Sequence, residues 1–302
     1  MNTQGSVYLN TSSDTVKFLI DTSVFNNCSN NKDGGCINYA NSGAFVQDRV
    51  CSFSTTVNLK WRLGVYCKID VSDYFKNHVQ DSSICNTGNE YHNGVKNIFL
   101  INGQIQLKSI NILFSKIDYG DFYDVHSYSN GSNSSYCTFS NSTSSIDGGN
   151  YKIRHFNSQN IFEIQNCNIL NNKNGGILQA DSAIVYIKNS SFIRNYPNGY
   201  FLYFSQYNTN PKITLDGCFI DDQHPKQYLS VIFTNNKTET FSNNLSHFSS
   251  AICHADNPII FYVKEQTDNK NEIDLINFSF SLINISCSYY SSSELFGSEI
   301  HF

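Results

Sequence analysis

The chain has 302 residues, of which 40% are hydrophobic and 15% are charged, and its formal net charge at pH 7 is -5. Sparse, slightly acidic charge argues against a nucleic-acid-binding protein, because such a protein needs a basic face. Aromatic residues make up 14% of the chain, which argues against intrinsic disorder.

The first predicted element is an N-terminal segment or cap over residues 1–15. The opening MNTQGSVYLNTSSDTVKFLID has neither the basic region nor the apolar region of a signal peptide.

From residue 16 onward, short alternating runs recur along the chain. They read VKFLIDTSVF, IQLKSINIL, IFEIQNCNIL, AIVYIKNSSF and KITLDGCF. Alternation with period two over six to ten residues is typical of half-buried strands. No sustained helical stripe accompanies them, so the sequence predicts an all-β protein.

These runs end on apolar anchors at one approximate interval, which averages about 28 residues. The anchors are Phe25, Phe53, Ile84, Ile112, Phe139, Ile169, Phe192, Phe219 and Phe248. Glycines supply a second register, at Gly35, Gly64, Gly94, Gly149, Gly176 and Gly199. Both registers shorten at the same place, from Ile169 to Phe192 and from Gly176 to Gly199. A shared period of this kind is typical of a solenoid.

The sequence therefore predicts a single-domain parallel β-helix of about ten coils, with about 28 residues per coil, over residues 16–262. The sequence does not fix the handedness of the coil, and the general preference for right-handed crossovers favours a right-handed one. The register is lost after residue 262, so residues 263–302 are expected to form a terminal irregular coil or cap.

Polar residues follow the anchors, where Asn tolerates the left-handed backbone of a tight turn and stacks on the Asn of the next coil. We expect a structural ladder of anchors and asparagines. Its members are Phe25, Asn27, Phe53, Phe139, Asn141, Asn171, Phe192, Asn195 and Phe219.

Ten cysteines are scattered along the chain without the paired spacing of a zinc site. Two interpretations stay open. The thiols are buried and free, acting as small apolar residues, or one or two disulfides join neighbouring coils. The first candidate pair is Cys36 with Cys67, which are separated by roughly one period on the glycine-led strands.

Ten N-glycosylation sequons occur, at Asn10, Asn27, Asn130, Asn133, Asn141, Asn189, Asn236, Asn244, Asn277 and Asn284. The chain has 41 Asn and 55 Ser plus Thr, so chance alone predicts about 7 or 8 such tripeptides. Their number by itself hardly favours secretion.

The anchors followed by Asn pairs, the glycine-led strands and the repeated interval resemble right-handed parallel β-helix proteins of the pectin-lyase-like fold. The Phe, Asn and Ser bias resembles the polymorphic outer membrane protein type of repeat protein found on cell surfaces, including those of eukaryotic microbes. The resemblance covers roughly residues 16–262. It implies either a surface adhesin or structural rod, or a sugar-acid depolymerase.

Depolymerases similar to polygalacturonases carry an Asn-Thr-Asp segment, an Asp pair, a Gly-His-Gly and an Arg-Ile-Lys. Only the Asp pair has a counterpart here, at Asp221 and Asp222. This pair follows an anchor, where other coils carry turn asparagines, so a turn role is the competing interpretation.

The stretch KIDYGDFYDVH places Asp118, Asp121 and Asp124 close together. Carboxylates with this spacing are candidate Ca²⁺ ligands, as in some pectate lyases. The competing interpretation is a solvated acidic loop.

We therefore expect a non-enzymatic β-helical repeat protein used in adhesion or as a structural scaffold, with a glycan or a cell-surface protein as partner and with no cofactor. A divergent carbohydrate-active enzyme is the alternative, and a nonfunctional copy from a large repeat family is a third. No long apolar stretch predicts a membrane span. A secreted or cell-surface location is implied by the resemblance alone.

Overall fold

The structure is a computed structural model. It describes residues 7–10, 15–57, 62–88, 94–117, 122–144, 150–154, 160–173, 176–196, 200–205, 212–221, 231–247 and 283–286. For residues 41, 42, 200–205 and 283–286 it describes the backbone alone.

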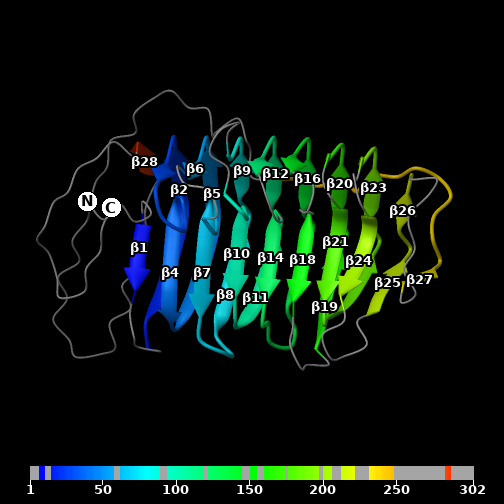
Figure 1. The fold of residues 1–302 in the computed structure, drawn as a ribbon, viewed down its shortest axis with the longest axis horizontal. Helices are drawn as coiled ribbons and strands as arrows, with labels where there is room; N and C mark the ends of the chain where they lie inside the picture. Colours follow the sequence, from blue (N-terminus) through cyan, green and yellow to red (C-terminus); the bar gives the residue numbers. More distant parts are fainter. Residues whose placement is uncertain are drawn as a thin grey trace, which may run out of the picture.

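The described residues form a parallel β-solenoid (Figure 1). One wall is an eight-stranded parallel sheet, here called sheet A. In spatial order its strands are β1 (Val7–Asn10), β4 (Ile37–Ser42), β7 (Cys67–Val71), β10 (Ile98–Ile101), β14 (Tyr123–His126), β18 (Tyr151–Arg154), β21 (Gly176–Asp181) and β24 (Tyr200–Ser205). Each coil contributes one strand to this wall.

The second wall is a sixteen-stranded parallel sheet, here called sheet B, which divides into two limbs. Both limbs begin in the long strands β2 (Lys17–Asn26) and β5 (Ala44–Phe53). The first limb continues through β8 (Lys76–Gln80), β11 (Gln104–Lys108), β15 (Asn133–Ser135), β19 (Ile161–Gln165), β22 (Ile184–Lys188), β25 (Lys212–Asp216) and β27 (Val231–Thr234). The second limb continues through β9 (Ser83–Cys85), β12 (Asn111–Leu113), β16 (Thr138–Ser140), β20 (Asn168–Leu170), β23 (Ser191–Ile193) and β26 (Phe219–Ile220).

Three further pairings complete the strands. Two short sheets pair β3 (Ser29–Asn30) with β6 (Thr56–Val57), and β13 (Lys116–Ile117) with β17 (Thr143–Ser144). Strand β28 (Ile283–Ser286) pairs in parallel with β2, the strand at the N-terminal end of sheet B. A late part of the chain thus lies beside the first coils.

The expected period is confirmed, but the expected number of coils is wrong. The register of sheet A connects Ile37 to Leu202 through six turns. These turns average about 28 residues each, which agrees with the period in the sequence. The structure supports about six turns rather than ten. Among the described residues we find strands and no helix, and therefore no helix that could cross a membrane.

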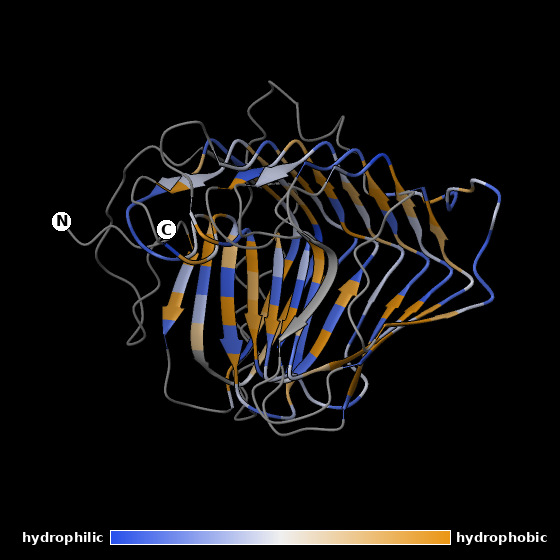
Figure 2. Ribbon diagram, turned by 45° about the vertical axis from the view of Figure 1, so that its right-hand side comes forward, coloured by the Kyte–Doolittle hydropathy of each residue, from blue (hydrophilic) through white to orange (hydrophobic). Residues whose placement is uncertain are grey.

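The interior is built by alternation along each strand, seen as alternating orange and blue segments in Figure 2. In sheet A, the inward positions stack from coil to coil, so that Tyr123 lies over Tyr151 with ring centroids 5.5 Å apart. Phe139, from sheet B, packs edge-on against both rings, at 4.5 and 4.8 Å. Burial of such side chains is the main stabilising term of each coil.

Left-handed residues form the corners between strands. At the bend between the two limbs they are Thr22, Arg49, Asp81, Ser109, Tyr136, Asn166, Asn189 and Gly217, with φ between 43° and 62°. At the end of the second limb they are Asn27, Ser54, Asn86, Phe114, Asn141, Asn171 and Arg194, with φ between 51° and 56°. Each turn repeats the same backbone geometry, so the corners stack and the solenoid stays regular.

Gly64 of the glycine register lies at the turn that leads into sheet A, and its counterpart in the preceding coil is Gly34, one residue before Gly35. Gly34 and Gly64 have φ of 70° and 73°. A Cβ on Gly34 would lie 2.3 Å from the carbonyl oxygen of Ile37, and one on Gly64 would lie 2.3 Å from that of Cys67. Side chains are excluded at both positions, which explains why glycine recurs there.

Most anchors stack in one column, although two are displaced by a residue. Ile84, Ile112, Phe139, Ile169 and Phe192 are in register. The same column contains Phe25, Ser52 and Ile220. Phe53 and Phe219 are therefore one residue out of register, which turns each side chain to the other face of its strand. Phe248 lies outside the described residues.

The buried polar ladder lies one residue after the corner. Asn27, Asn141 and Asn171 are the corner residues themselves, and Asn27 and Asn141 are exposed. Asn172 and Asn195 are buried, and the Asn172 amide donates to Asn195 Oδ1 at 3.2 Å and to the Phe139 carbonyl at 3.0 Å. The column continues through Thr55, Thr87, Ser115 and Ser142. Of the expected asparagines, only Asn195 belongs to it.

Residues 235–247, here called the strap, leave the coil and run across the outside of the second limb (Figure 1). The Lys237 amide donates to the Cys218 carbonyl at 2.8 Å. Asn243 then exchanges hydrogen bonds with Asn168, two of them at 2.9 Å. His247 reaches Thr138 at 2.7 Å. The strap thus crosses four coils in reverse order. It lies within the range 16–262, all of which was expected to form coils of the β-helix.

The seven described free cysteines are all buried. Cys36 and Cys67 are two of them, so the candidate bridge between them is not formed, and the Cys36 sulfur lies 3.2 Å from the Thr55 hydroxyl. Burial raises the pKa of Cys85 and of Cys218 to about 11, which keeps these thiols protonated and unreactive. Cys51 differs, because it is disulfide-bonded.

Candidate binding face on sheet A

The outer face of sheet A carries two columns of side chains. In parallel sheets, residues in register lie side by side on one face. The first column contains Asn38, Lys68, Phe99, Asp124, Lys152 and Gln179. The second contains Asp70, Ile101, His126, Arg154 and Asp181. Together they mix charge, amide and apolar surface on one wall.

An ion cluster lies in the middle of this face. Asp124 is fully buried, and its Oδ2 atom is 2.6 Å from Lys96 Nζ and 3.1 Å from Arg154 Nη2. Lys96 comes from the turn before β10, and its ammonium also lies 3.7 Å from the centroid of the Phe99 ring. A buried carboxylate held by two cations, one of which is stacked on an aromatic ring, is strongly positioned.

Two atoms of the cluster have hydrogen-bonding capacity left. Asp124 Oδ1 and Arg154 Nε are buried and have no hydrogen-bond partner among the described residues. One is an acceptor and the other a donor.

His126 lies next to this cluster in the second column. Burial lowers its pKa, and Arg154 and Lys96 lower it further, while Asp124 and Asp181 oppose them. The imidazole is therefore neutral at pH 7, and a neutral ring offers one donor and one acceptor.

The candidate Ca²⁺ ligands are not assembled among the described residues. Asp124 is committed to Lys96 and Arg154, while Asp118 and Asp121 lie outside the described residues. No group of three or more potential metal ligands occurs among the described residues.

Only one residue of the candidate acid pair is described. Asp222 lies outside the described residues, and Asp221 is exposed and accepts a hydrogen bond from the Arg194 backbone amide. Arg194 is a left-handed corner residue of the preceding coil. Asp221 thus occupies a position that caps a turn.

Lys96 and Arg154 are functional candidates that the sequence did not single out. The period contained the signal, because Arg154 follows His126 by one coil and pairs with it in register. Applying the interval to the charged residues of the glycine-led strands would have placed His126, Arg154 and Asp181 in one column.

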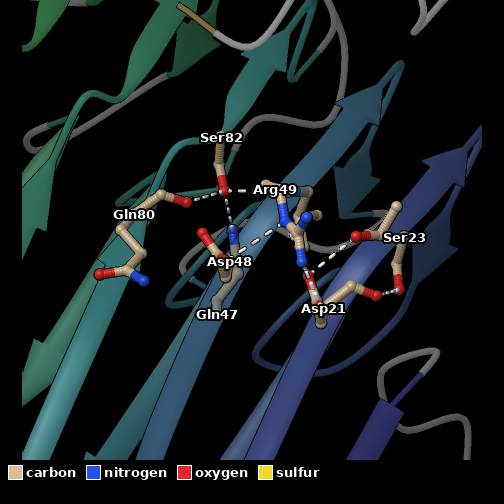
Figure 3. Close-up of polar contacts among 9 residues, drawn as sticks. Asp21, Ser23, Gln47, Asp48, Arg49, Gln80 and Ser82 are labelled. Atoms are coloured by element: carbon tan, nitrogen blue, oxygen red, sulfur yellow. Dashed lines mark hydrogen bonds and ion pairs between the residues drawn. The ribbon is translucent and has the colours of Figure 1, made fainter. Parts of the chain in front are cut away.

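A second polar cluster lies at the bend of sheet B (Figure 3). Arg49 is 2.6 Å from Asp21 and 3.3 Å from Asp48, and its side chain is 51% exposed. Beside it, Ser82 accepts a hydrogen bond from Gln47 at 3.0 Å and donates to the Gln80 carbonyl at 2.7 Å. Burial raises the pKa of Asp48, which Arg49 partly offsets. These contacts connect three neighbouring coils, and we assign them a structural role.

Comparisons of the chain with protein-family models, with curated proteins and with solved structures found no match. The structure therefore assigns the chain to the parallel β-solenoids and to no family.

Proposed function

We propose that the chain is a non-enzymatic β-helical repeat protein, a surface adhesin or structural scaffold that binds its partner on the outer face of sheet A. The proposed coil is right-handed and of the pectin-lyase-like type, as the resemblance implies. The proposed partner is a glycan or a cell-surface protein.

The observation that carries the proposal is the state of Asp124. An acid or base catalyst has to exchange its proton with substrate, whereas this carboxylate is buried between two cations. In the same column Asn38 and Lys68 are partly exposed on two adjacent coils, and Lys152 and Gln179 on two others, with the buried Phe99 and Asp124 between the two pairs. Two pairs of an amide and a cation spread along one wall suit an extended polar ligand, such as a glycan chain, better than a single scissile bond.

A glycan array with the purified protein tests the binding proposal. We expect binding to extended, polar or acidic glycans, weakened by Lys152→Ala. The matched control is Lys108→Ala, because Lys108 is an exposed lysine on the first limb of sheet B. Equal loss in both variants would contradict recognition by sheet A.

A divergent carbohydrate-active enzyme is the second candidate function. It is favoured by the closeness of His126 to Asp124 and Asp181, whose carboxylates oppose the lowering of the His126 pKa by burial. Incubation with polygalacturonate, with and without Ca²⁺, separates the two functions. Chain cleavage that is abolished by His126→Gln would replace the scaffold proposal, and binding without cleavage would support it.

A further inference from the structure

Burial divides the asparagines of this chain into two groups. Eight of the ten sequon asparagines have described side chains. Seven of these are exposed, namely Asn10, Asn27, Asn130, Asn141, Asn189, Asn236 and Asn244, and Asn133 is partly buried. Of the 18 other asparagines with described side chains, only Asn86 and Asn235 are exposed. The same residue type is thus placed outside when Ser or Thr follows two positions later.

Turn geometry alone does not produce this division. Left-handed corners hold three sequon asparagines, Asn27, Asn141 and Asn189, and all are exposed. They also hold other asparagines, Asn86, Asn102, Asn166, Asn171 and Asn235, of which only Asn86 and Asn235 are exposed. A corner position therefore allows an asparagine side chain to be exposed but does not require it. Exposure follows membership of a sequon more closely than it follows a corner position.

We propose that this chain carries N-linked glycans on the seven exposed sequon asparagines. In the transfer, the side-chain amide nitrogen attacks the anomeric carbon of a lipid-pyrophosphate-linked oligosaccharide. A carbon–nitrogen bond forms, the lipid pyrophosphate leaves, and the amide gives up one proton. A bulky polar glycan needs an attachment point on the surface of the folded protein, which these seven positions supply.

The disulfide at Cys51 agrees with the same cellular route. Disulfides persist in oxidising compartments, which are also where N-linked glycans are added. The other seven cysteines that are described are buried thiols, so they are protected from oxidation there.

The glycans would leave the candidate binding face open. From β4 to β24, no sequon lies in a strand of sheet A. The seven sites lie instead at the first strand of the stack, on corners and turns, and on the residues that follow β27. On this point the inference rests on the proposed function, whereas site occupancy can be measured independently of any ligand.

The experiment expresses the chain behind a cleavable secretion leader in a eukaryotic host and maps occupied sites by peptide mass spectrometry after enzymatic deglycosylation. Most of the seven asparagines are expected to be occupied. A secreted, folded protein with none of the seven occupied would overturn the proposal.

A new sequon at a buried asparagine is the matched control. Lys152→Thr creates a sequon at Asn150, which is fully buried, and Lys152→Ala changes the same residue without creating one. A glycan at Asn150 should obstruct folding, so we expect a several-fold lower secreted yield for Lys152→Thr than for Lys152→Ala. Secretion of Lys152→Thr with an occupied Asn150 at the yield of Lys152→Ala would overturn the argument that burial distinguishes the sites that can carry a glycan from those that cannot.

Discussion

The outer face of sheet A and the outer face of the second limb of sheet B are built from the same coils but are stabilised in different ways. On the second limb, the strap covers the strands and satisfies Asn168 and Thr138 with its own groups. On sheet A, side chains of the coils themselves bury a charge, through Lys96, Asp124 and Arg154. The strap covers one face, whereas the other face presents charged and amide side chains of the coils.

The largest expected effect comes from breaking the ion cluster. Asp124→Ala would leave the ammonium of Lys96, which is only 8% exposed, without its carboxylate. Removing one partner of a buried pair typically costs about 3–5 kcal/mol. Urea unfolding should show a loss of that size, and a loss below about 1 kcal/mol would mean that the cluster is solvated.

The next effect tests the strap. Asn168→Ala removes two hydrogen bonds with Asn243 at 2.9 Å and leaves the strap's backbone groups unpaired. We expect a loss of about 1–3 kcal/mol and faster amide exchange over residues 241–247. Lys76→Ala, at the exposed start of β8 on the first limb, should leave exchange in the strap unchanged. Slow exchange in Asn168→Ala would show that the strap is held elsewhere.

A smaller effect depends on pH and also concerns the strap. Burial lowers the pKa of His247 below its ordinary value of 6.5. The unfolded chain therefore takes up a proton as pH falls below 6.5, while the folded strap resists it. The free energy of unfolding is therefore highest above pH 6.5 and decreases as the pH falls below it, because the unfolded chain binds the proton more readily.

Amide exchange of the strap at pH 7.5 and pH 5.5 measures this dependence. We expect lower protection of the strap amides at the lower pH in the natural protein, once the slower intrinsic exchange at that pH is divided out, and a weaker dependence in His247→Gln. A pH dependence that persists in the variant would assign the titration to another group.

The smallest effect is expected at the bend of sheet B. Arg49→Ala removes ion pairs with Asp21 and Asp48, but the arginine side chain is 51% exposed. Exposed pairs contribute about 0–1 kcal/mol, so thermal unfolding should hardly change. A loss comparable to that of Asp124→Ala would contradict the distinction between an exposed and a buried ion cluster.

Much of the fold could be predicted because each coil repeats the same local requirements. The interval is visible in the sequence because Gly34 and Gly64 must leave room for a backbone carbonyl. It is also visible because Ile112, Phe139 and Ile169 stack in one column. The coil number could not be predicted in the same way. The strap keeps the Asn-rich, Phe-containing composition of the coils, so composition does not mark where coiling stops.

The candidate site was less predictable than the fold. Asp124 was singled out for its neighbours in sequence, Asp118 and Asp121, whereas its partners Lys96 and Arg154 come from the adjacent coils on either side. The sequons show the same limit. Their number is close to chance, and only burial separates Asn141 on the surface from Asn172 in the interior.

The sequence by itself determined the period, the all-β class and the positions where glycine or a left-handed residue is required, because these depend on steric rules within one coil. Tertiary structure alone decided the register, and therefore which charges meet on sheet A, which cysteines remain free and which asparagines reach solvent. The physical reason is the side-chain period of two along a strand: a shift of one residue, as at Phe53 and Phe219, moves a side chain from one face to the other.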